Sequence, residues 1–380
     1  MKQVLFGARI FDGTRFHDNS AVVVDNGLIE GIIPYSERPK HGVMHDLAGG
    51  FLSPGLIDWQ INGGGGVLFN ETPSVAGIRS ILSAHRKYGT TECLVTVITD
   101  SQRVMTEALV AAKAAKGFVP GLLGIHVEGP FIDDQKSGAH PREHIRNLSN
   151  QELEWLIRHK SGVMVVTLAP NKVSPDTIKQ LVRNDIIVSV GHSNASDIET
   201  LDAIEAGASG MTHLFNAMSA MSHRMPGLVG VGLSDSRIIC GLIADGHHVA
   251  QTAIKVAIAA RGPKGLALVS DAMPSAAGGP DHFELQKRSV RREGTRLTLE
   301  DETLAGSNTT LLESIHFLVR VVGIELGAAL EMATLTPARL LKINNQYGRI
   351  APKFKASLLH LSSDLETKQT WIDGVPSEPT

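Results

Sequence analysis

The stretch VMVVTLAPNKVSPDTIKQLVRNDIIVSVGHS, from Val163 to Ser193, carries the pattern that decides the fold. Two continuous apolar runs, Val163–Ala169 and Ile186–His192, flank a segment with helical spacing, Pro175–Arg183. Apolar runs that do not alternate with polar residues are typical of parallel strands buried on both faces. The stretch therefore predicts one strand–helix–strand unit of a parallel sheet.

The same unit recurs along residues 52–345. We expect eight buried strands, at Leu56–Asn62, Thr91–Thr99, Gly121–Phe131, Val163–Ala169, Ile186–His192, Gly210–Asn216, Ile238–Ala244 and Ala267–Ala272. Helical patterns lie between most of them, at Val75–Tyr88, Arg103–Lys116, Asn150–His159, Pro175–Arg183, Asp197–Ala206 and Val249–Ala260. Eight such units predict an α/β protein with a (β/α)₈ TIM-type barrel. An open doubly wound sheet is the alternative, but the glycines of 63–66 lack the strand–GxGxxG–helix layout of a nucleotide site.

Both chain ends have a different pattern. Short apolar runs near the N-terminus are separated by the turn dipeptides Asp12-Gly13 and Asn26-Gly27, and similar runs close the chain. We expect residues 1–51 and 346–380 to form one small β-sandwich domain, and residues 52–345 to form the catalytic barrel. Within the barrel, Pro274–Gly306 has no helical period and predicts an elaborated loop with a hairpin at Glu293-Gly294.

Composition narrows the class of protein. The 380 residues carry 36 Lys+Arg and 39 Asp+Glu, a formal net charge of −3, and 42% are hydrophobic. A near-neutral chain without basic runs argues against nucleic acid or an anionic membrane as a partner. Apolar stretches end well before the roughly 18 residues of a membrane span, and Met1–Gly13 does not resemble a signal peptide. Since Cys93 and Cys240 make no disulfide framework, we expect a cytoplasmic protein.

Titratable residues gather where four predicted strands end. Glu128 lies in HVEGP (126–130), His192 in GHS (191–193), His213 in THL (212–214) and Asp271 in SDA (270–272). Parallel barrels place their active sites at this end, so we expect the four side chains to converge. A single buried histidine is more often a packing residue, but four at equivalent strand ends favour a site. Two imidazoles and a carboxylate are a common open ligand set for a catalytic divalent metal.

Asp271 has a different predicted role from its neighbours. A carboxylate beside a metal-activated water can take up its proton and pass it to a leaving nitrogen. The alternative is a turn residue, since Pro274 and Gly278 follow.

Several motifs in order resemble a known family. PGLID (54–58), following a β-rich N-terminus, is similar to the amidohydrolase superfamily. HVEGP, GHS, THLFNAM (212–218), ADGHH (244–248), SDA, LAGS (304–307) and MATLTPA (332–338) together resemble the N-acetylglucosamine-6-phosphate deacetylase family. The resemblance implies hydrolysis of the acetamide of N-acetylglucosamine 6-phosphate to glucosamine 6-phosphate and acetate.

The resemblance also implies a metal cofactor, and the chain departs from the superfamily pattern at one motif. The superfamily usually carries His-x-His at the end of the first strand for a second metal, where this chain has Gln60 and Asn62. Amides are poor Zn²⁺ ligands, so we expect one divalent ion per subunit, Zn²⁺ before Fe²⁺ or another ion, held by Glu128, His192 and His213. Gln60 and Asn62 are expected to orient water or substrate instead.

Substrate contacts are carried over from the same family. His140 resembles the residue that meets the acetyl carbonyl, acting beside Asp271 in catalysis. The resemblance implies that a sugar phosphate contacts Ala139, Asn216, Ala217, Arg224, His248 and Leu304. It further implies a homodimer in which Arg224 reaches the partner's site, although a solvated loop charge is the alternative for this residue. His248 is preferred to the adjacent His247 by position alone.

Other functions remain open at this point. The same scaffold suits an N-acetylgalactosamine-6-phosphate deacetylase, an N-acyl-amino-acid deacylase or a cyclic-amide hydrolase. A non-catalytic sugar-phosphate-binding barrel is a further alternative, against which the presence of Asp271 argues, because binding alone needs no acid/base.

Overall fold

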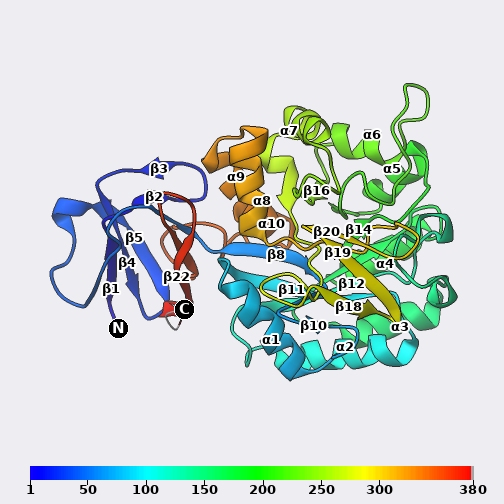
Figure 1. Cartoon of the computed structure of the whole chain (residues 1–380), viewed down its shortest axis with the longest axis horizontal. Helices are drawn as coiled ribbons and strands as arrows, with labels where there is room; N and C mark the ends of the chain where they lie inside the picture. Colours follow the sequence, from blue (N-terminus) through cyan, green and yellow to red (C-terminus); the bar gives the residue numbers. More distant parts are fainter. Residues whose placement is uncertain (378–380) are drawn as a thin grey trace.

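The protein is built around one eight-stranded parallel sheet (Figure 1). The computed structural model describes residues 1–377. The strands run in the order β17-β16-β15-β14-β13-β12-β11-β8. They are β8 (Leu56–Ile61), β11 (Thr90–Ile98), β12 (Leu122–Glu128), β13 (Val163–Leu168), β14 (Ile187–Val190), β15 (Gly210–Met211), β16 (Ile239–Leu242) and β17 (Leu266–Leu268). All eight predicted strands are present and neighbours in sequence are neighbours in space.

The sheet closes between its first and last strands. An isolated parallel bridge joins Ile61 to Ala272, just beyond β8 and β17. Asp271 N–H donates to the Gln60 carbonyl at 3.0 Å, and the N–H groups of Asn62 and Gly63 donate to the Ala272 carbonyl at 3.0 and 2.8 Å. The predicted (β/α)₈ barrel is confirmed, and its closing seam lies directly at the ends of the strands that carry Gln60 and Asp271.

Helices surround the barrel. Serine residues at their N-termini and apolar residues on one face favour helix formation in these segments. They are α1 (Val75–Arg86), α2 (Gln102–Ala115), α3 (Asn150–His159), α4 (Pro175–Arg183), α5 (Asp197–Glu205), α6 (Gly227–Ser234), α7 (Gln251–Gly265), α8 (Leu311–Phe317), α9 (Leu326–Ala333) and α10 (Leu335–Leu340). Helices α1 to α5 each begin after a serine whose side chain accepts a backbone N–H of the first turn, a contact that stabilises a helix by about 1 kcal/mol. In residues 1–377, no helix combines the length and apolar character needed to cross a membrane.

Two further sheets lie beside the barrel in Figure 1: the first is built from N-terminal strands alone, and the second combines strands from both chain ends. One has the order β5-β4-β1-β6, and the other β23-β22-β21-β7-β2-β3. Their strands are β1 (Gln3–Phe6), β2 (Arg9–Phe11), β3 (Phe16–His17), β4 (Ser20–Asp25), β5 (Leu28–Pro34), β6 (Val43–Asp46), β7 (Phe51–Pro54), β21 (Leu358–Leu361), β22 (Thr367–Ile372) and β23 (Val375–Pro376).

The two end sheets share one apolar core. Leu5 and Val22 from the first sheet pack with Leu52, Leu358 and Trp371 from the second. The six-stranded sheet extends along β7 to Pro54. The domain boundaries, with residues 1–51 and 346–380 in the small domain and residues 52–345 in the barrel, stay a prediction.

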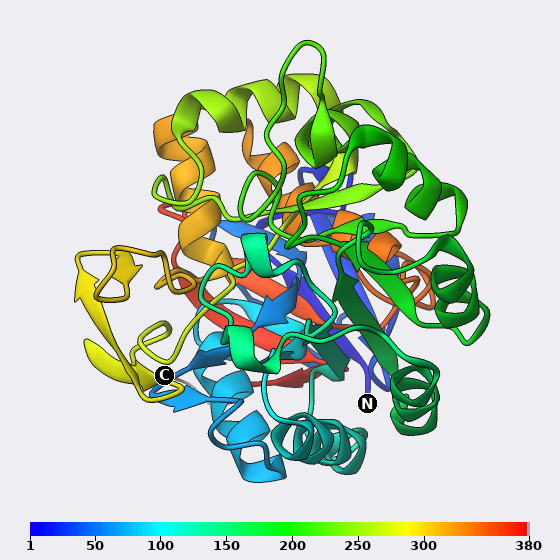
Figure 2. The ribbon, with the colours of Figure 1, turned by 90° about the vertical axis from the view of Figure 1, so that its right-hand side faces the viewer.

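A small antiparallel sheet follows β17 and lies at the edge of the barrel mouth, in yellow in Figure 2. It consists of β18 (His282–Leu285), β19 (Arg288–Glu293) and β20 (Arg296–Thr298), with the β19–β20 turn at Gly294. Its apolar face, formed by Leu285, Val290 and Leu297, packs against Ile98 and Met273. The expected elaborated loop is therefore an ordered three-stranded element that touches the barrel mouth.

Candidate active site

The four predicted strand-end residues meet at the barrel mouth. Glu128 is the last residue of β12, and His192, His213 and Asp271 follow β14, β15 and β17. The last three have left-handed backbones, with φ of 46°, 33° and 51°. Each such conformation costs about 1 kcal/mol or more and occurs mainly where a site requires it. Strand β15 consequently stops at Met211, although the apolar pattern predicts a strand to Asn216, because the chain turns at His213 to aim its imidazole inward.

Glu128, His192 and His213 form a tight buried cluster. Glu128 Oε1 lies 3.2 Å from His192 Nε2 and 3.0 Å from His213 Nε2. The two imidazole Nε2 atoms are 3.0 Å apart. Their side chains are between 3 and 6% exposed, so the cluster is largely buried.

The protonation pattern of this cluster fits a divalent cation. A carbonyl oxygen only accepts hydrogen bonds, so the 2.8 Å contact from His192 Nδ1 to the Lys136 carbonyl places the proton on Nδ1. In the neutral imidazole, Nε2 then offers a lone pair that can bind a cation, whereas in the protonated imidazole Nε2 donates to Glu128 Oε1. A second-sphere carbonyl that fixes the imidazole in this way is typical of metal-binding histidines. Two imidazoles and one carboxylate leave open positions for water and substrate.

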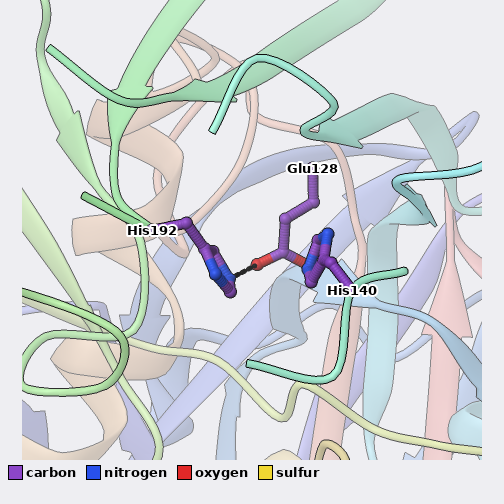
Figure 3. A group of neighbouring side chains, drawn as sticks. All are labelled: Glu128, His140 and His192. Atoms are coloured by element: carbon purple, nitrogen blue, oxygen red, sulfur yellow. Dashed lines mark hydrogen bonds and ion pairs between the residues drawn. The ribbon is translucent and has the colours of Figure 1, made fainter. Parts of the chain in front are cut away.

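His140 extends the cluster on its other side. The ligand atoms of Glu128, His140 and His192 all lie within 4.8 Å of one another. Figure 3 shows the two imidazoles on either side of the Glu128 carboxylate. His140 Nδ1 contacts Thr99 Oγ1 at 2.7 Å, and since a hydroxyl can donate or accept, His140 Nε2 can either carry a hydrogen or offer a lone pair. His140 is thus placed either to donate to a substrate carbonyl or to join the ligand set.

Burial and charge set the protonation states. Burial opposes ionisation of Glu128, but hydrogen bonds and charges from His192 and His213 outweigh it and hold the pKa of Glu128 well below its usual range. Burial also opposes the charge on His213, yet the contacts with Glu128 and the charge of Asp271 raise the pKa of His213. Burial holds the pKa of His140 well below its usual range, so this imidazole is neutral. Burial and the charge of Glu128 raise the pKa of Asp271 to about 6.

Two amides connect the carboxylates. Gln60 Nε2 donates to Glu128 Oε1 at 3.0 Å and to Asp271 Oδ1 at 3.2 Å, and Asn62 Nδ2 donates to the same Asp271 oxygen at 2.7 Å. Both amides therefore turn their N–H groups toward carboxylates. The amide oxygens of Gln60 and Asn62 are buried without a protein partner.

A cavity of about 360 Å³ opens above the cluster. Its lining includes the cluster residues Glu128, His140, His192, His213 and Asp271 together with the predicted substrate residues Asn62, Ala139, Asn216, Ala217, His248 and Leu304. Gln60 lies beneath, against Glu128. Arg224 is in an exposed loop and does not line this cavity in the chain described here.

The geometry separates His248 from its neighbour His247. His248 Nδ1 contacts Asp245 Oδ2 at 2.7 Å, and its side chain is 6% exposed at the cavity wall. His247 instead points to Thr295 Oγ1, 2.7 Å away at the surface. Asp245 orients the His248 imidazole and keeps a hydrogen on Nδ1.

The sequence motifs did not identify several residues around the cavity. Thr99, the partner of His140, follows β11, so the same strand-end rule identifies it. The Lys136 carbonyl, which fixes His192, has no sequence signal because any residue supplies one. Leu285 and Met273 line the cavity through packing of the β18–β20 sheet, a contact that no local pattern reveals.

The fold and the cluster together define a (β/α)₈-barrel protein with a candidate divalent-metal centre at its mouth. The chain belongs to the amidohydrolase family: the model of that family matches residues 51–376, and that of the NagA composite domain matches residues 4–52. Membership makes it a hydrolase that acts on an amide.

Similar proteins cover almost the whole chain. An N-acetylgalactosamine-6-phosphate deacetylase from Shewanella sp. (strain ANA-3) is 38% identical over 371 residues, 97% of this chain and 94% of that protein. The N-acetylglucosamine-6-phosphate deacetylase of Bos taurus is 35% identical over 354 residues, 90% of this chain and 86% of that protein. The crystal structure of N-acetylglucosamine-6-phosphate deacetylase from Pasteurella multocida matches with a TM-score of 0.96 and 33% identity, over 99% of this chain and 100% of that one.

Proposed function

We propose that the protein hydrolyses the acetamide of N-acetylglucosamine 6-phosphate to glucosamine 6-phosphate and acetate. One observation carries the proposal: the buried Glu128–His192–His213 cluster lies beside Asp271 on the floor of a cavity that also contains His248. The deacetylases of Bos taurus and Pasteurella multocida share this fold or sequence over most of the chain. N-acetylgalactosamine 6-phosphate is the second candidate, which the Shewanella relative favours.

In this proposal Glu128, His192 and His213 hold one divalent ion, with Zn²⁺ as the first choice and Fe²⁺ or another ion as alternatives. A bound ion of this kind polarises a carbonyl and lowers the pKa of water. His140 lies beside the cluster, where an Nε2–H stabilises negative charge on the carbonyl oxygen when Thr99 donates to Nδ1.

Asp271 is the proposed acid and base. Its carboxylate takes a proton from the attacking water while the water oxygen bonds to the carbonyl carbon. The same proton then passes to the amide nitrogen, the C–N bond breaks, and the amine leaves with acetic acid, which retains the second water hydrogen and ionises to acetate in solution. Asn62 and Gln60 hold Asp271 Oδ1, so they keep the carboxylate aimed at the reacting atoms.

The phosphate end of the substrate is proposed to bind at the wall formed by Asn216, Ala217 and His248, with Leu304 and Ala139 lining the rest of the path. Arg224 lies on an exposed loop with Met221 and Met225, which are 59 and 73% exposed. We propose that this loop meets a second subunit in a homodimer and carries Arg224 to the partner's cavity. Two buried free cysteines, Cys93 and Cys240, agree with a cytoplasmic location.

The test is acetate release by the purified protein, with its metal content measured beforehand. The substrates are N-acetylglucosamine 6-phosphate, N-acetylgalactosamine 6-phosphate and unphosphorylated N-acetylglucosamine. We expect release from the first and a large loss of kcat/KM without the phosphate, since charge-assisted contacts are lost. Binding of the sugar phosphate in calorimetry with no acetate from any substrate would instead support a silent binding barrel. Equal rates on the phosphorylated and unphosphorylated sugars would favour a different amidohydrolase reaction.

A further inference from the structure

The cavity above the metal cluster has two chemically different walls. Asn216 and His248 bring polar groups to one wall. The other wall is apolar and consists of Ile98, Met273 and Leu285, which are 5, 2 and 1% exposed. Ile98 belongs to β11 and Asn216 follows β15, and these strands lie four places apart in the eight-strand order. Ile98 and Asn216 therefore lie on opposite sides of the barrel mouth, whereas Met273 follows β17, the neighbour of the strand β16 that His248 follows.

The apolar wall is built from distant parts of the chain. Ile98 ends β11, Met273 follows β17, and Leu285 ends β18 of the small sheet. The three belong to one apolar cluster, against which Ala139 also packs. Since Ala139 directly precedes His140, the wall adjoins the imidazole that is placed to meet a substrate carbonyl.

Two polar side chains, with three hydrogen bonds in total, attach the small sheet that carries Leu285 to the cavity wall. Gln286 Nε2 donates to the Thr99 carbonyl and to Asp100 Oδ2, both at 2.8 Å. Arg288 Nη2 donates to the Ala139 carbonyl. These bonds attach the segment that follows Leu285 to Thr99, which contacts His140, and to Ala139, which precedes His140.

We infer that Ile98, Met273 and Leu285 form an acyl wall that receives the methyl group of the substrate amide and limits the length of the acyl chain, with Leu285 as the specificity-determining residue. The inference rests on the proposed function. An N-acylated sugar phosphate is anionic at one end and apolar at its acyl end. Apolar surface gains free energy from burial, whereas phosphate does not, so the acyl end binds the apolar wall. A longer acyl chain overpacks this wall.

The experiment compares the N-acetyl, N-propionyl and N-butyryl derivatives of glucosamine 6-phosphate as substrates. We expect kcat/KM of the unaltered protein to fall steeply with acyl length. Leu285→Ala removes three carbons from the wall, so the ratio of kcat/KM for butyryl over acetyl should rise about tenfold or more, which is the effect of one or two methylenes in an apolar pocket. Leu285→Val should shift the ratio less in the same direction and provides the measurement if the alanine variant does not fold.

Val290→Ala is the matched control. Val290 is fully buried in the same apolar cluster and pairs with Phe283 across the β18–β19 hairpin, but it does not line the cavity. Its replacement should leave the acyl preference unchanged.

The outcomes distinguish failure of the acyl-wall inference from failure of the proposed deacetylase function. A Leu285-specific gain for longer acyl chains supports the acyl wall. An unchanged ratio in both Leu285 variants, or an equal change in Val290→Ala, would overturn it while acetate release by the unaltered protein still stood. Failure of the unaltered protein to release any acyl group would refute the proposed function and remove the basis of the inference.

Discussion

Glu92 is a carboxyl group buried where the barrel meets the end sheets, and its replacement by glutamine is a sharp test of the electrostatics. Glu92 is 2% exposed, near the start of β11. Its Oε2 accepts the Thr91 hydroxyl, and the Ser357 hydroxyl is a further partner. Glu92 Oε1 is buried without a partner. Burial, opposed by these hydrogen bonds and by the charge of Arg86, raises the pKa of Glu92 from 4.5 to about 7.

The sign and size of the effect follow from that change. Because the folded protein binds this proton more tightly than the unfolded chain, the stabilisation is fully present below pH 4.5 and is lost as the pH rises through 7. Raising a pKa from 4.5 to about 7 corresponds to about 3 kcal/mol of free energy of unfolding. Between pH 5 and pH 8 the loss amounts to about 2 to 3 kcal/mol. Glutamine has an amide oxygen that can accept from Thr91 in place of the carboxyl oxygen, and it cannot ionise, so Glu92→Gln escapes this loss.

The assay is urea denaturation of both proteins at pH 5 and pH 8. We expect the stability of Glu92→Gln relative to the unaltered protein to increase by about 2 to 3 kcal/mol from pH 5 to pH 8. Glu154→Gln, on the exposed face of α3, is the control and should show no such change. A constant difference at the two pH values would refute the reasoning. A variant that becomes relatively less stable at pH 8 would show that Arg86 stabilises the ionised carboxylate.

The remaining predictions concern the site. Asp271→Asn should lower kcat for acetate release by about 10²- to 10⁴-fold with unchanged metal content, and near-full activity in that variant would contradict the acid/base role. Since Asp271 acts as a base and burial raises its pKa to about 6, kcat/KM of the unaltered protein should fall as the pH drops below about 6; a pH–rate profile that is flat from 5 to 8 would contradict this. Glu128→Gln removes the negative ligand, so elemental analysis should find well under one metal ion per chain, and full occupancy would exclude Glu128 as a ligand. Thr99→Val removes the partner of His140 Nδ1 and should lower kcat more than it raises KM, with rescue by Thr99→Ser.

Much of the barrel was predictable because its signals are local. Parallel strands buried on both faces need continuous apolar residues, and their carboxyl ends share one edge, so the motifs alone located Glu128, His192, His213 and Asp271. The predicted strand at β15 was too long, because the left-handed backbone of His213 ends the strand early. An apolar run does not reveal such a turn, because the tertiary contact with Glu128 compensates its local strain.

The amino-acid order by itself therefore determined the number and sequence of the βα units and the chemical identity of the strand-end residues, since both depend on hydrophobic pattern and residue type. Tertiary structure alone decided how those residues act together. The proton on His192 is fixed by a carbonyl from another loop, and Asp271 is held by amides more than 200 residues earlier in the chain. Leu285 reaches the cavity only because the small sheet packs on Ile98 and Met273. Such contacts form between segments remote in sequence, and burial then shifts protonation by amounts that no local pattern encodes.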